Sequence, residues 1–335
     1  MDKGMPDVIL LGDINIDISA SMPAYPSRGG EGVANAVEYH TGGSVVSTAV
    51  ALSKMGVETG IIGRVGNDAL SAQVMTDLAR FGIDSTHIQV DSVVSTGLIY
   101  IVVNPDGERT MFAARGANVF TTPDEKWADY FASARWYHLS GYALLSEPQS
   151  RAASYGLELA QQIHCGISLD PNPEPAMRYA SQIRALLPKV DIFFPNQQEL
   201  MLLSNGKPFV DAVEDMLDAG TKAVVVKRGA EGCIVATRKT YLELPAFEIR
   251  VKNTTGAGDC FNAGVVLGRM VGLGWAASGI LGNALGAIAS ANAGAGAGAV
   301  SANRVVELIE QDMFKPQWEK WHGALEQVLA YLAGV

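Results

Sequence analysis

NTTGAGDCFNAG, residues 253–264, contains one carboxylate, Asp259, directly behind a loop of small and polar residues. The glycines of the loop leave backbone N–H groups unshielded, and the apolar residues after Asp259 predict a buried helix. A helix N-terminus with bare amides binds anions, because the helix dipole and the unpaired donors both favour negative charge. Asp259 is either an N-cap or a base that deprotonates a hydroxyl for attack on a phosphoryl group. The glycine loop favours the base, since a cap needs no such loop.

Outward from this stretch, short β-rich runs alternate with helical patterns. The early part of the chain predicts strands at 8–12 and 59–66 and helices at 47–56 and 69–82. Four later stretches each predict a strand and a turn that are followed by a helix: 135–141, 166–172, 191–196 and 222–229. This alternation predicts an α/β fold whose mostly parallel sheet carries helices on both faces. Ligands of such sheets bind beyond the carboxyl ends of the strands.

Two segments break the alternation, and we call them together the lid. Residues 14–41 contain proline and glycine with little helical periodicity, and residues 94–116 predict a hairpin that turns at 104–108. We expect antiparallel strands added to the edge of the main sheet, either as inert decoration or as a lid that excludes water from the site. Exposed strand edges invite pairing with a second copy, which predicts a homodimer through the lid, with a monomer whose edge is shielded as the alternative. Nothing else divides the chain, so residues 1–335 form a single domain.

Composition excludes several classes of protein. The 335 residues carry a formal net charge of −10 and a pI near 5.0, which argues against nucleic acid as a partner. Three scattered cysteines without a CxxC pattern indicate neither a disulfide framework nor a zinc site. Between Asp259 and Arg304 the only charge is Arg269, but the many Ala, Gly and Asn residues favour packed interior helices over a membrane span. We therefore expect a cytoplasmic protein with no membrane partner.

Further polar residues lie where predicted strands end. Asn15 and Asp17 are two residues apart, so they share one face of a strand end. Asn196 and Glu199 are neighbours in the first turn of a predicted helix. Their oxygens suit either a hydrated Mg²⁺ or a capping box. A GG turn at 42–43 opens another helix.

With these motifs in order, the chain resembles the ribokinase-like (PfkB) carbohydrate kinase family over nearly its whole length. The C-terminal signature of that family, DTxGAGD, is present as NTTGAGD at 253–259. The other matching stretches are GG at 42–43 with ALSKMG at 51–56 and IGRVGND at 62–68, PNQQEL at 195–200, VVVKRGAEG at 224–232 and GNALGAIA at 282–289. The resemblance implies a ribokinase-like central sheet sandwiched by helices, with a small β-strand lid. It also implies ATP-dependent transfer of the γ-phosphoryl to a hydroxymethyl group of a sugar or sugar acid.

The resemblance also implies a role for each matching residue. Asp259 would be the base, and the amides of Gly256, Ala257 and Gly258 would form the anion hole. Asn196 and Glu199 would hold Mg²⁺ through bridging water molecules. The ATP-binding residues would be Asn196, Lys227, Gly229, Gly232 and Asn283. The substrate-binding residues would be Asn15, Asp17, Gly42, Gly43 and Ser47.

Two positions depart from the family pattern. Ser47 stands where an asparagine commonly binds sugar hydroxyls, which argues against a ribokinase-type sugar contact. The segment YHLSGYALLSEPQ at 137–149 lacks the acidic sugar contact of ribokinases and is more similar to fructokinase- or ketodeoxygluconate-kinase-like members. Asn253 stands where relatives that need potassium have Asp, and the lost charge predicts reduced dependence on a monovalent cation. A nucleoside kinase of the same superfamily and a catalytically silent sugar-binding regulator remain alternatives. A panel of acceptors separates them.

Overall fold

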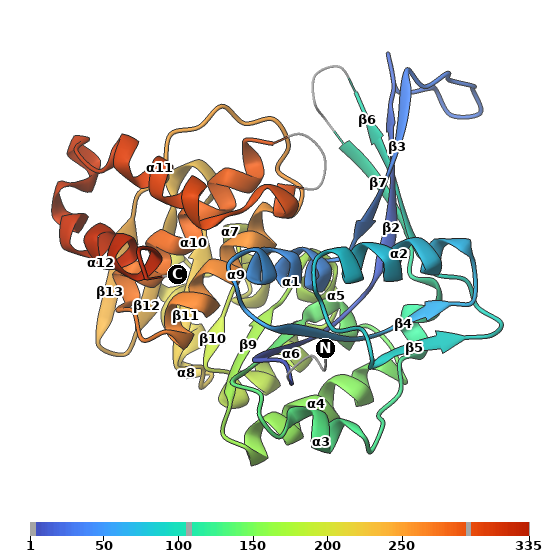
Figure 1. Ribbon diagram of the computed structural model, residues 1–335, viewed down its shortest axis with the longest axis horizontal. Helices are drawn as coiled ribbons and strands as arrows, with labels where there is room; N and C mark the ends of the chain where they lie inside the picture. Colours follow the sequence, from blue (N-terminus) through green and yellow to red (C-terminus); the bar gives the residue numbers. More distant parts are fainter. Residues whose placement is uncertain (1–4, 105–108, 293–295, 335) are drawn as a thin grey trace.

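The computed structural model of the chain describes residues 5–104, 109–292 and 296–334. Within these ranges the strands form one sheet of nine and a separate sheet of four (Figure 1). In spatial order the large sheet consists of β13 (Thr240–Leu244), β12 (Cys233–Thr237), β11 (Ala223–Lys227), β10 (Ile192–Phe193), β9 (Gly166–Asp170), β8 (Trp136–Ser140), β1 (Val8–Leu11), β4 (Thr59–Gly66) and β5 (Ile88–Asp91). The small sheet consists of β3 (Ala36–Gly42), β2 (Asn15–Ser21), β6 (Gly97–Val103) and β7 (Arg109–Ala114).

The large sheet is parallel from β5 to β11, which confirms the predicted mostly parallel sheet. Only β12 and β13 are antiparallel. The helix predicted after the run at 222–229 is wrong, because β11 is followed by this hairpin instead. Its residues Cys233–Thr237 and Thr240–Leu244 are rich in β-branched and apolar side chains, and the turn between them is too short for a helix.

Helices cover both faces of the sheet, as expected. One layer contains α1 (Ser44–Lys54), α2 (Ala69–Arg80), α9 (Ala257–Met270), α10 (Trp275–Ser290), α11 (Ala302–Asp312) and α12 (His322–Leu332). The other contains α3 (Trp127–Phe131), α4 (Gln149–Gln162), α5 (Pro173–Arg178), α6 (Ala180–Leu186), α7 (Gln197–Leu203) and α8 (Phe209–Asp218). Short 3₁₀ helices are η1 (Gly116–Phe120), η2 (Gly141–Leu144), η3 (Leu187–Lys189), η4 (Gly229–Glu231), η5 (Gly296–Ala299) and η6 (Pro316–Trp321). Alternate residues of β1 serve the two layers: Val8 and Leu10 pack against the first, Ile9 and Leu11 against the second.

The apolar segment after Asp259 folds into α9 and α10, which pack closely on each other. A Cβ on Gly264 would lie 2.7 Å from the Gly282 Cα, so the glycines permit this close approach. The interior-helix interpretation of the segment is therefore confirmed. Among the residues described, no helix is both long enough and apolar enough to cross a membrane.

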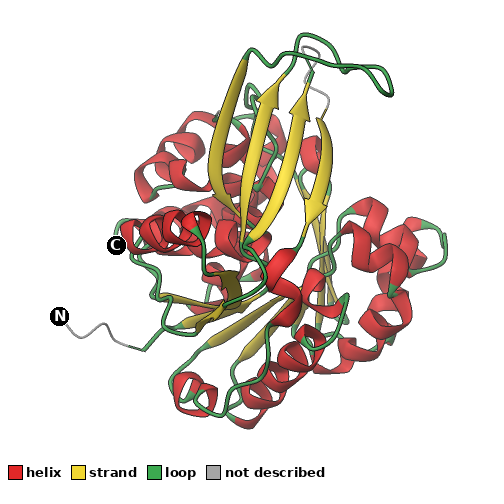
Figure 2. Cartoon of the chain, turned by 90° about the vertical axis from the view of Figure 1, so that its right-hand side faces the viewer, coloured by secondary structure: helices red, strands yellow, loops and turns green. Residues whose placement is uncertain are grey.

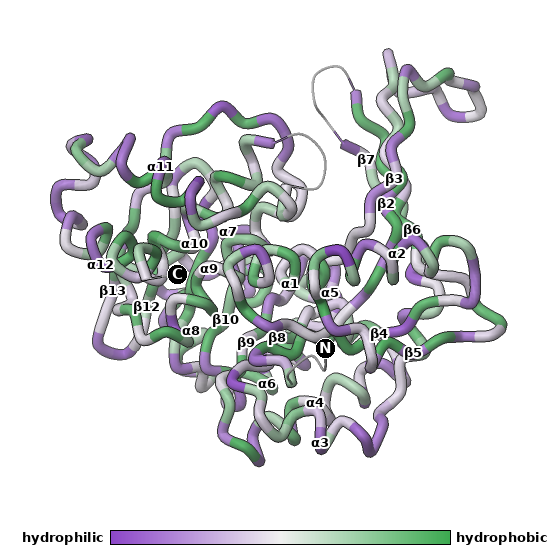
Figure 3. The backbone as a smooth tube through the Cα atoms, in the orientation of Figure 1, coloured by the Kyte–Doolittle hydropathy of each residue, from purple (hydrophilic) through white to green (hydrophobic). Residues whose placement is uncertain are grey.

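The lid is a sheet of its own that stands out from the body (Figures 1 and 2). The expectation that it extends the edge of the main sheet is wrong in this respect. β2 and β6 both start at the body, so they run in the same direction and pair in parallel. β3 pairs antiparallel with β2, and β7 pairs antiparallel with β6. Most of the turn predicted at 104–108 lies outside the described residues. Hydrophobic residues occur along these projecting strands (Figure 3).

Candidate active site

The glycine loop ends at the N-terminus of α9. Gly256 is the N-cap and has φ 75°, a left-handed conformation that favours glycine. The helix begins at Ala257, so Asp259 is its third residue and not its cap. The N-cap interpretation of Asp259 is therefore wrong. The Ala257 amide donates to Thr254 O at 3.2 Å, and the remaining first-turn amides lack intrahelical acceptors, as in every α-helix.

Asp259 lies in a strongly charged neighbourhood. Part of its surface is open, but the surrounding protein removes most of its hydration. This burial raises the pKa of Asp259 to about 8, and the Asp170 carboxylate adds to the rise while Lys227 opposes it. A carboxylate with such a pKa takes up a proton readily near neutral pH, which is the property required of a general base.

Lys227, at the end of β11, lies directly under the loop. Its Nζ is 2.7 Å from Asp170 Oδ2, and a Cβ on Gly258 would lie 3.7 Å from the same Nζ. Asn262 Nδ2 also donates to Asp170 Oδ2, at 2.6 Å. Burial lowers the pKa of Lys227, but Asp170 and Glu199 outweigh it and raise this pKa above its ordinary value. The ammonium is therefore a fixed positive charge under the glycine loop.

Asp170 and Asn262 were not among the residues selected from the sequence. The signal for Asp170 was its place at the end of a predicted strand, in LDPN, where parallel sheets bind ligands. Asn262 carried no comparable signal, because it lies inside an apolar helix.

Asn196 and Glu199 form a capping box at the start of α7. Asn196 Oδ1 accepts from the Glu199 amide at 2.8 Å, and Glu199 Oε2 accepts from the Asn196 amide at 2.8 Å. Glu199 is buried, which raises its pKa to about 7, although Lys227 lowers it in part. The capping interpretation is thus correct. Among the described residues no group of three His, Cys, Asp or Glu side chains is arranged to hold a metal ion directly.

A cavity of about 500 Å³ lies between the inner face of the lid and the residues before α9. Asp17, Gly42 and Ser47 line it. Asp17 Oδ1 is buried without a hydrogen-bond partner in the described part of the chain. Burial raises the Asp17 pKa to about 6, with His40 opposing the rise. An unsatisfied carboxylate oxygen of this kind is ready to accept a hydrogen bond from a ligand.

The other two predicted substrate residues, Asn15 and Gly43, are not among the residues that line this cavity, but both are neighbours of Gly42, which lines it. Asn15 pairs with Gly42 across β2 and β3, and its Oδ1 accepts from Asn118 Nδ2 at 2.9 Å. Gly43 has φ 110°, and a Cβ there would overlap the Asp13 carbonyl. The second glycine of the GG pair is thus required by backbone geometry.

A second cavity, of about 410 Å³, lies on the other side of the loop. Lys227, Gly229, Gly232 and Asn283 line it, together with Ala257, Gly258 and the apolar side chains of Val251, Phe247 and Phe261. The two cavities share Val251 and Thr254, so they adjoin at the residues that precede α9. The Asn283 side chain donates to Pro245 O at 2.9 Å.

Another cavity, of about 660 Å³, is at the opposite end of the sheet. Trp136, Gly166 and Ile192, which begin β8, β9 and β10, line it. None of the predicted site residues contributes to it. Because ligands of parallel sheets bind at the carboxyl ends of the strands, the two cavities around the glycine loop are the candidate site.

Arg109 connects the lid to this loop, and the sequence had not singled it out. It donates to Asn253 Oδ1 at 2.9 Å and to the hydroxyls of Thr254 and Thr255. Asn253 Oδ1 also accepts from the Thr255 amide at 2.9 Å. Asn253, the residue at which the chain departs from the DTxGAGD pattern, therefore contacts the lid through Arg109.

Comparisons with known proteins agree with this geometry. A model described as pfkB family carbohydrate kinase matches residues 5–302. A maize fructokinase-1 is 27% identical over 285 residues, covering 81% of this chain and 85% of the relative. A Salmonella typhi deoxyribokinase is 28% identical over 264 residues, covering 76% and 83%. The structure of Arabidopsis thaliana ribokinase complexed with ribose and ATP superposes with a TM-score of 0.79 at 21% identity, covering 92% of this chain and 99% of that one. The chain belongs to the pfkB family of carbohydrate kinases, which are phosphotransferases acting on a sugar hydroxyl.

Proposed function

We propose that this kinase transfers the γ-phosphoryl of ATP to a hydroxymethyl group of a sugar or sugar acid bound under the lid. One observation carries the proposal: Asp259, with its raised pKa, lies in the first turn of α9, whose first residues Ala257 and Gly258 line one cavity, while Thr255, just before the N-cap, lines the other. The cavity under the lid suits the acceptor, because its unsatisfied Asp17 oxygen accepts from a hydroxyl. The cavity beside Lys227 suits ATP, because apolar walls for the base meet the glycine loop there.

In this scheme the acceptor hydroxyl gives its proton to Asp259 while its oxygen attacks the γ-phosphorus, and ADP leaves. The amides of Gly256 and Gly258 face the negative charge that develops during transfer, and the Ala257 amide would join them by exchanging its bond to Thr254 O. Lys227 supplies a fixed positive charge beneath them. Closing the lid excludes water, which would otherwise compete as the acceptor.

Phosphoryl transfer of this kind uses Mg²⁺ to neutralise charge on the phosphates. The Asn196 and Glu199 side chains each use an oxygen to cap α7, so they fit an ion held through water rather than by direct ligation. Glu199 is close enough to Lys227 and Asp170 for their charges to shift its pKa, and Lys227 lines the cavity proposed for ATP, which supports a role for Glu199 there.

The acceptor cavity favours a sugar over a nucleoside. Proteins hold a base largely by stacking it on aromatic rings, each worth roughly 1–3 kcal/mol. Of the described residues that line this cavity, none is Phe, Tyr or Trp. Most are polar or small; the larger apolar ones are Ile101, Val103 and Val251, and the charged or titratable ones are Asp17, Glu38, His40, Arg109 and Lys252. The names of the maize, Salmonella and Arabidopsis relatives point to neutral sugars as the first acceptors to test.

The test is ADP release measured with a panel of neutral sugars, sugar acids and nucleosides, each with ATP and Mg²⁺. We expect turnover with at least one sugar or sugar acid and much less with nucleosides. Turnover confined to nucleosides would favour the nucleoside-kinase alternative. Sugar binding in a calorimeter without ADP release from any acceptor would favour the silent regulator and overturn the proposal.

A homodimer through the lid is the second part of the proposal. The outward face of the lid carries Tyr39, Tyr100 and Phe112, which are 61%, 46% and 52% exposed. Tyr39 and Tyr100 both pair with Ile18, and Phe112 pairs with Tyr100, so these side chains form one row across the sheet. A row of exposed aromatic side chains on one sheet face is typical of an interaction surface. A second lid presents the same row and would cover it.

A further inference from the structure

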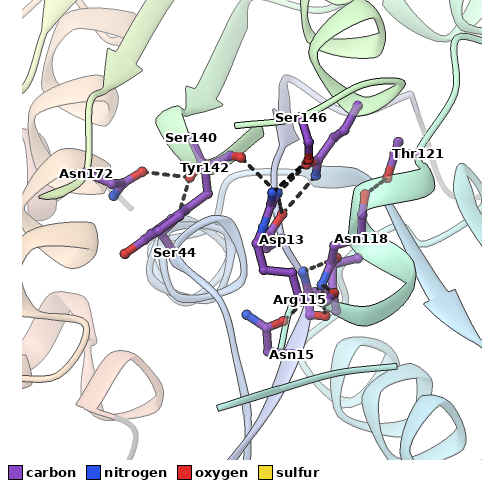
Figure 4. A network of polar contacts seen from close by, with 12 residues as sticks. Asp13, Asn15, Ser44, Arg115, Asn118, Thr121, Ser140, Tyr142, Ser146 and Asn172 are labelled. Atoms are coloured by element: carbon purple, nitrogen blue, oxygen red, sulfur yellow. Dashed lines mark hydrogen bonds and ion pairs between the residues drawn. The ribbon is translucent and has the colours of Figure 1, made fainter. Parts of the chain in front are cut away.

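Behind the acceptor cavity, Asn118 of η1 makes a set of buried hydrogen bonds (Figure 4). Asn118 Oδ1 accepts from the Ile14 amide at 2.8 Å. Because a backbone N–H can only donate, this bond fixes which end of the Asn118 amide is oxygen. Asn118 Nδ2 must then point the other way, toward Ile14 O at 3.0 Å, Arg115 O at 2.9 Å and Asn15 Oδ1 at 2.9 Å.

The fixed amide of Asn118 fixes that of Asn15 in turn. If Asn15 turned its own NH₂ toward Asn118, two donor groups would face each other at 2.9 Å, so Asn15 turns its oxygen there instead. Asn15 is 5% exposed, and a Cβ on Gly97 would overlap its Oδ1, so the space around this oxygen is closed. Within the described residues the Asn15 Nδ2 has no acceptor of its own. The Asn15 group that is left to bind a ligand is therefore its NH₂, a hydrogen-bond donor.

The backbone that carries this arrangement is held by a buried ion pair. Asp13 and Arg115 lie on two of the connections between the body and the lid, and Arg115 Nε is 2.7 Å from Asp13 Oδ2. Arg115 Nη2 also donates to Tyr142 O at 2.8 Å, and Gln149 Nε2 donates to Asp13 Oδ1 at 2.8 Å. These contacts hold Asp13 and therefore also its neighbour Ile14, whose amide fixes the orientation of the Asn118 and Asn15 side-chain amides.

We propose that Asn118 is a positioning residue that sets the hydrogen-bond polarity of the acceptor site through Asn15. Asn15 then offers only its NH₂, while Asp17, two residues along the same strand face, offers only an unsatisfied oxygen. A hydroxyl that accepts from the first and donates to the second satisfies both, whereas a group that only donates or only accepts satisfies one. The inference rests on the proposed function, because it concerns how that acceptor is held.

The decisive variant is Asn118→Asp. The introduced carboxylate still accepts from the Ile14 amide but cannot donate to Asn15. Asn15 is then free to turn its NH₂ toward position 118 and its oxygen toward the acceptor. We expect the acceptor KM to rise about tenfold, as for one lost hydrogen bond, while the ATP KM stays within about twofold because the ATP cavity is untouched.

Two further variants separate positioning from a general structural role. In an Asn15→Ala background, Asn118→Asp should cause no further rise in the acceptor KM, because the amide through which it acts is gone. Thr121→Val is the matched control: Thr121 directly follows η1, and its buried hydroxyl donates to the Asn118 carbonyl at 2.9 Å but takes no part in orienting the two side-chain amides. Its acceptor KM should match that of the wild type.

The same proteins provide a readout that needs no turnover. The side-chain NH₂ signals of Asn118, identified in ¹⁵N spectra by their absence from Asn118→Asp, should shift in Asn15→Ala and not in Thr121→Val. Acceptor KM values of Asn118→Asp within twofold of wild type, or an equal rise in the Asn15→Ala background, would overturn the inference. If the wild type phosphorylated no sugar, the proposed function would fall, and unchanged Asn118 signals in Asn15→Ala would then overturn the positioning role separately.

Discussion

Replacing Asp259 by asparagine should abolish most of the activity and stabilise the fold. The side chain keeps its shape but loses both its charge and its capacity to take up a proton. Removing a general base typically costs about 10²–10⁴-fold in kcat. The stabilisation follows from the environment of the carboxylate, which raises its pKa to about 8, chiefly by burial and then by Asp170.

The size of the stabilisation depends on pH. Between the ordinary carboxyl pKa of 3.8 and the folded value of about 8, the folded chain holds a proton that the unfolded chain has released. The wild-type free energy of unfolding therefore falls as pH rises across this window, by at most about 5 kcal/mol at pH 8. Lys227 and Glu199 readjust their own protonation, so we expect Asp259→Asn to gain about 1–3 kcal/mol at pH 8 and clearly less at pH 5.

Urea unfolding at pH 5 and pH 8 measures the gain, ADP release measures kcat, and calorimetry tests whether ATP binding persists. Asp211→Asn, an exposed carboxylate on α8 at the other face of the sheet, is the control and should change none of these. A variant that retained kcat within tenfold of wild type would refute Asp259 as the base. A stability gain that was equal at both pH values would refute the buried-charge reasoning.

Four further predictions follow from the same contacts. Below pH 8, kcat/KM for the acceptor should fall as Asp259 becomes protonated, approaching about tenfold per pH unit; a flat profile between pH 6 and 8 would contradict this. Arg109→Ala removes the three contacts between lid and loop, so kcat should fall about tenfold with an unchanged melting temperature, and steady-state kinetics within twofold of wild type would count against it. Because the Asn253 oxygen is neutral and engaged by Arg109 and Thr255, activity in K⁺-free buffer should stay within about twofold of that with K⁺; a collapse that K⁺ restores would show the opposite. Tyr100→Asp introduces a charge in the outward row of the lid and should yield monomers in sedimentation experiments, and an unchanged mass would exclude this interface.

Much of the fold was predictable because its signals are local. The strand at Thr59–Gly66 and the helix at Ala69–Arg80 were recognised from periodicity and flanking turns, and both are confirmed. The hairpin of β12 and β13 was missed because the earlier alternation of strand and helix was extended past Lys227. The lid was recognised as β-rich, but its separate sheet was not, because strand pairing between Asn15 and Gly97 is a long-range choice that periodicity does not reveal.

In the candidate site, too, local features were predictable and long-range contacts were not. The sequence by itself determined that a glycine loop opens a helix and that Asp259 follows it in the first turn, because N–H exposure and helix position depend on neighbours within a few residues. Only the tertiary structure decided the charge state of that carboxylate, since its pKa depends on burial and on Asp170 and Lys227, which arrive from other strands. It also decided the contact of Arg109 with Asn253, which are 144 residues apart. Electrostatic and hydrogen-bond partners of this kind are brought together by packing, and no spacing along the chain records them.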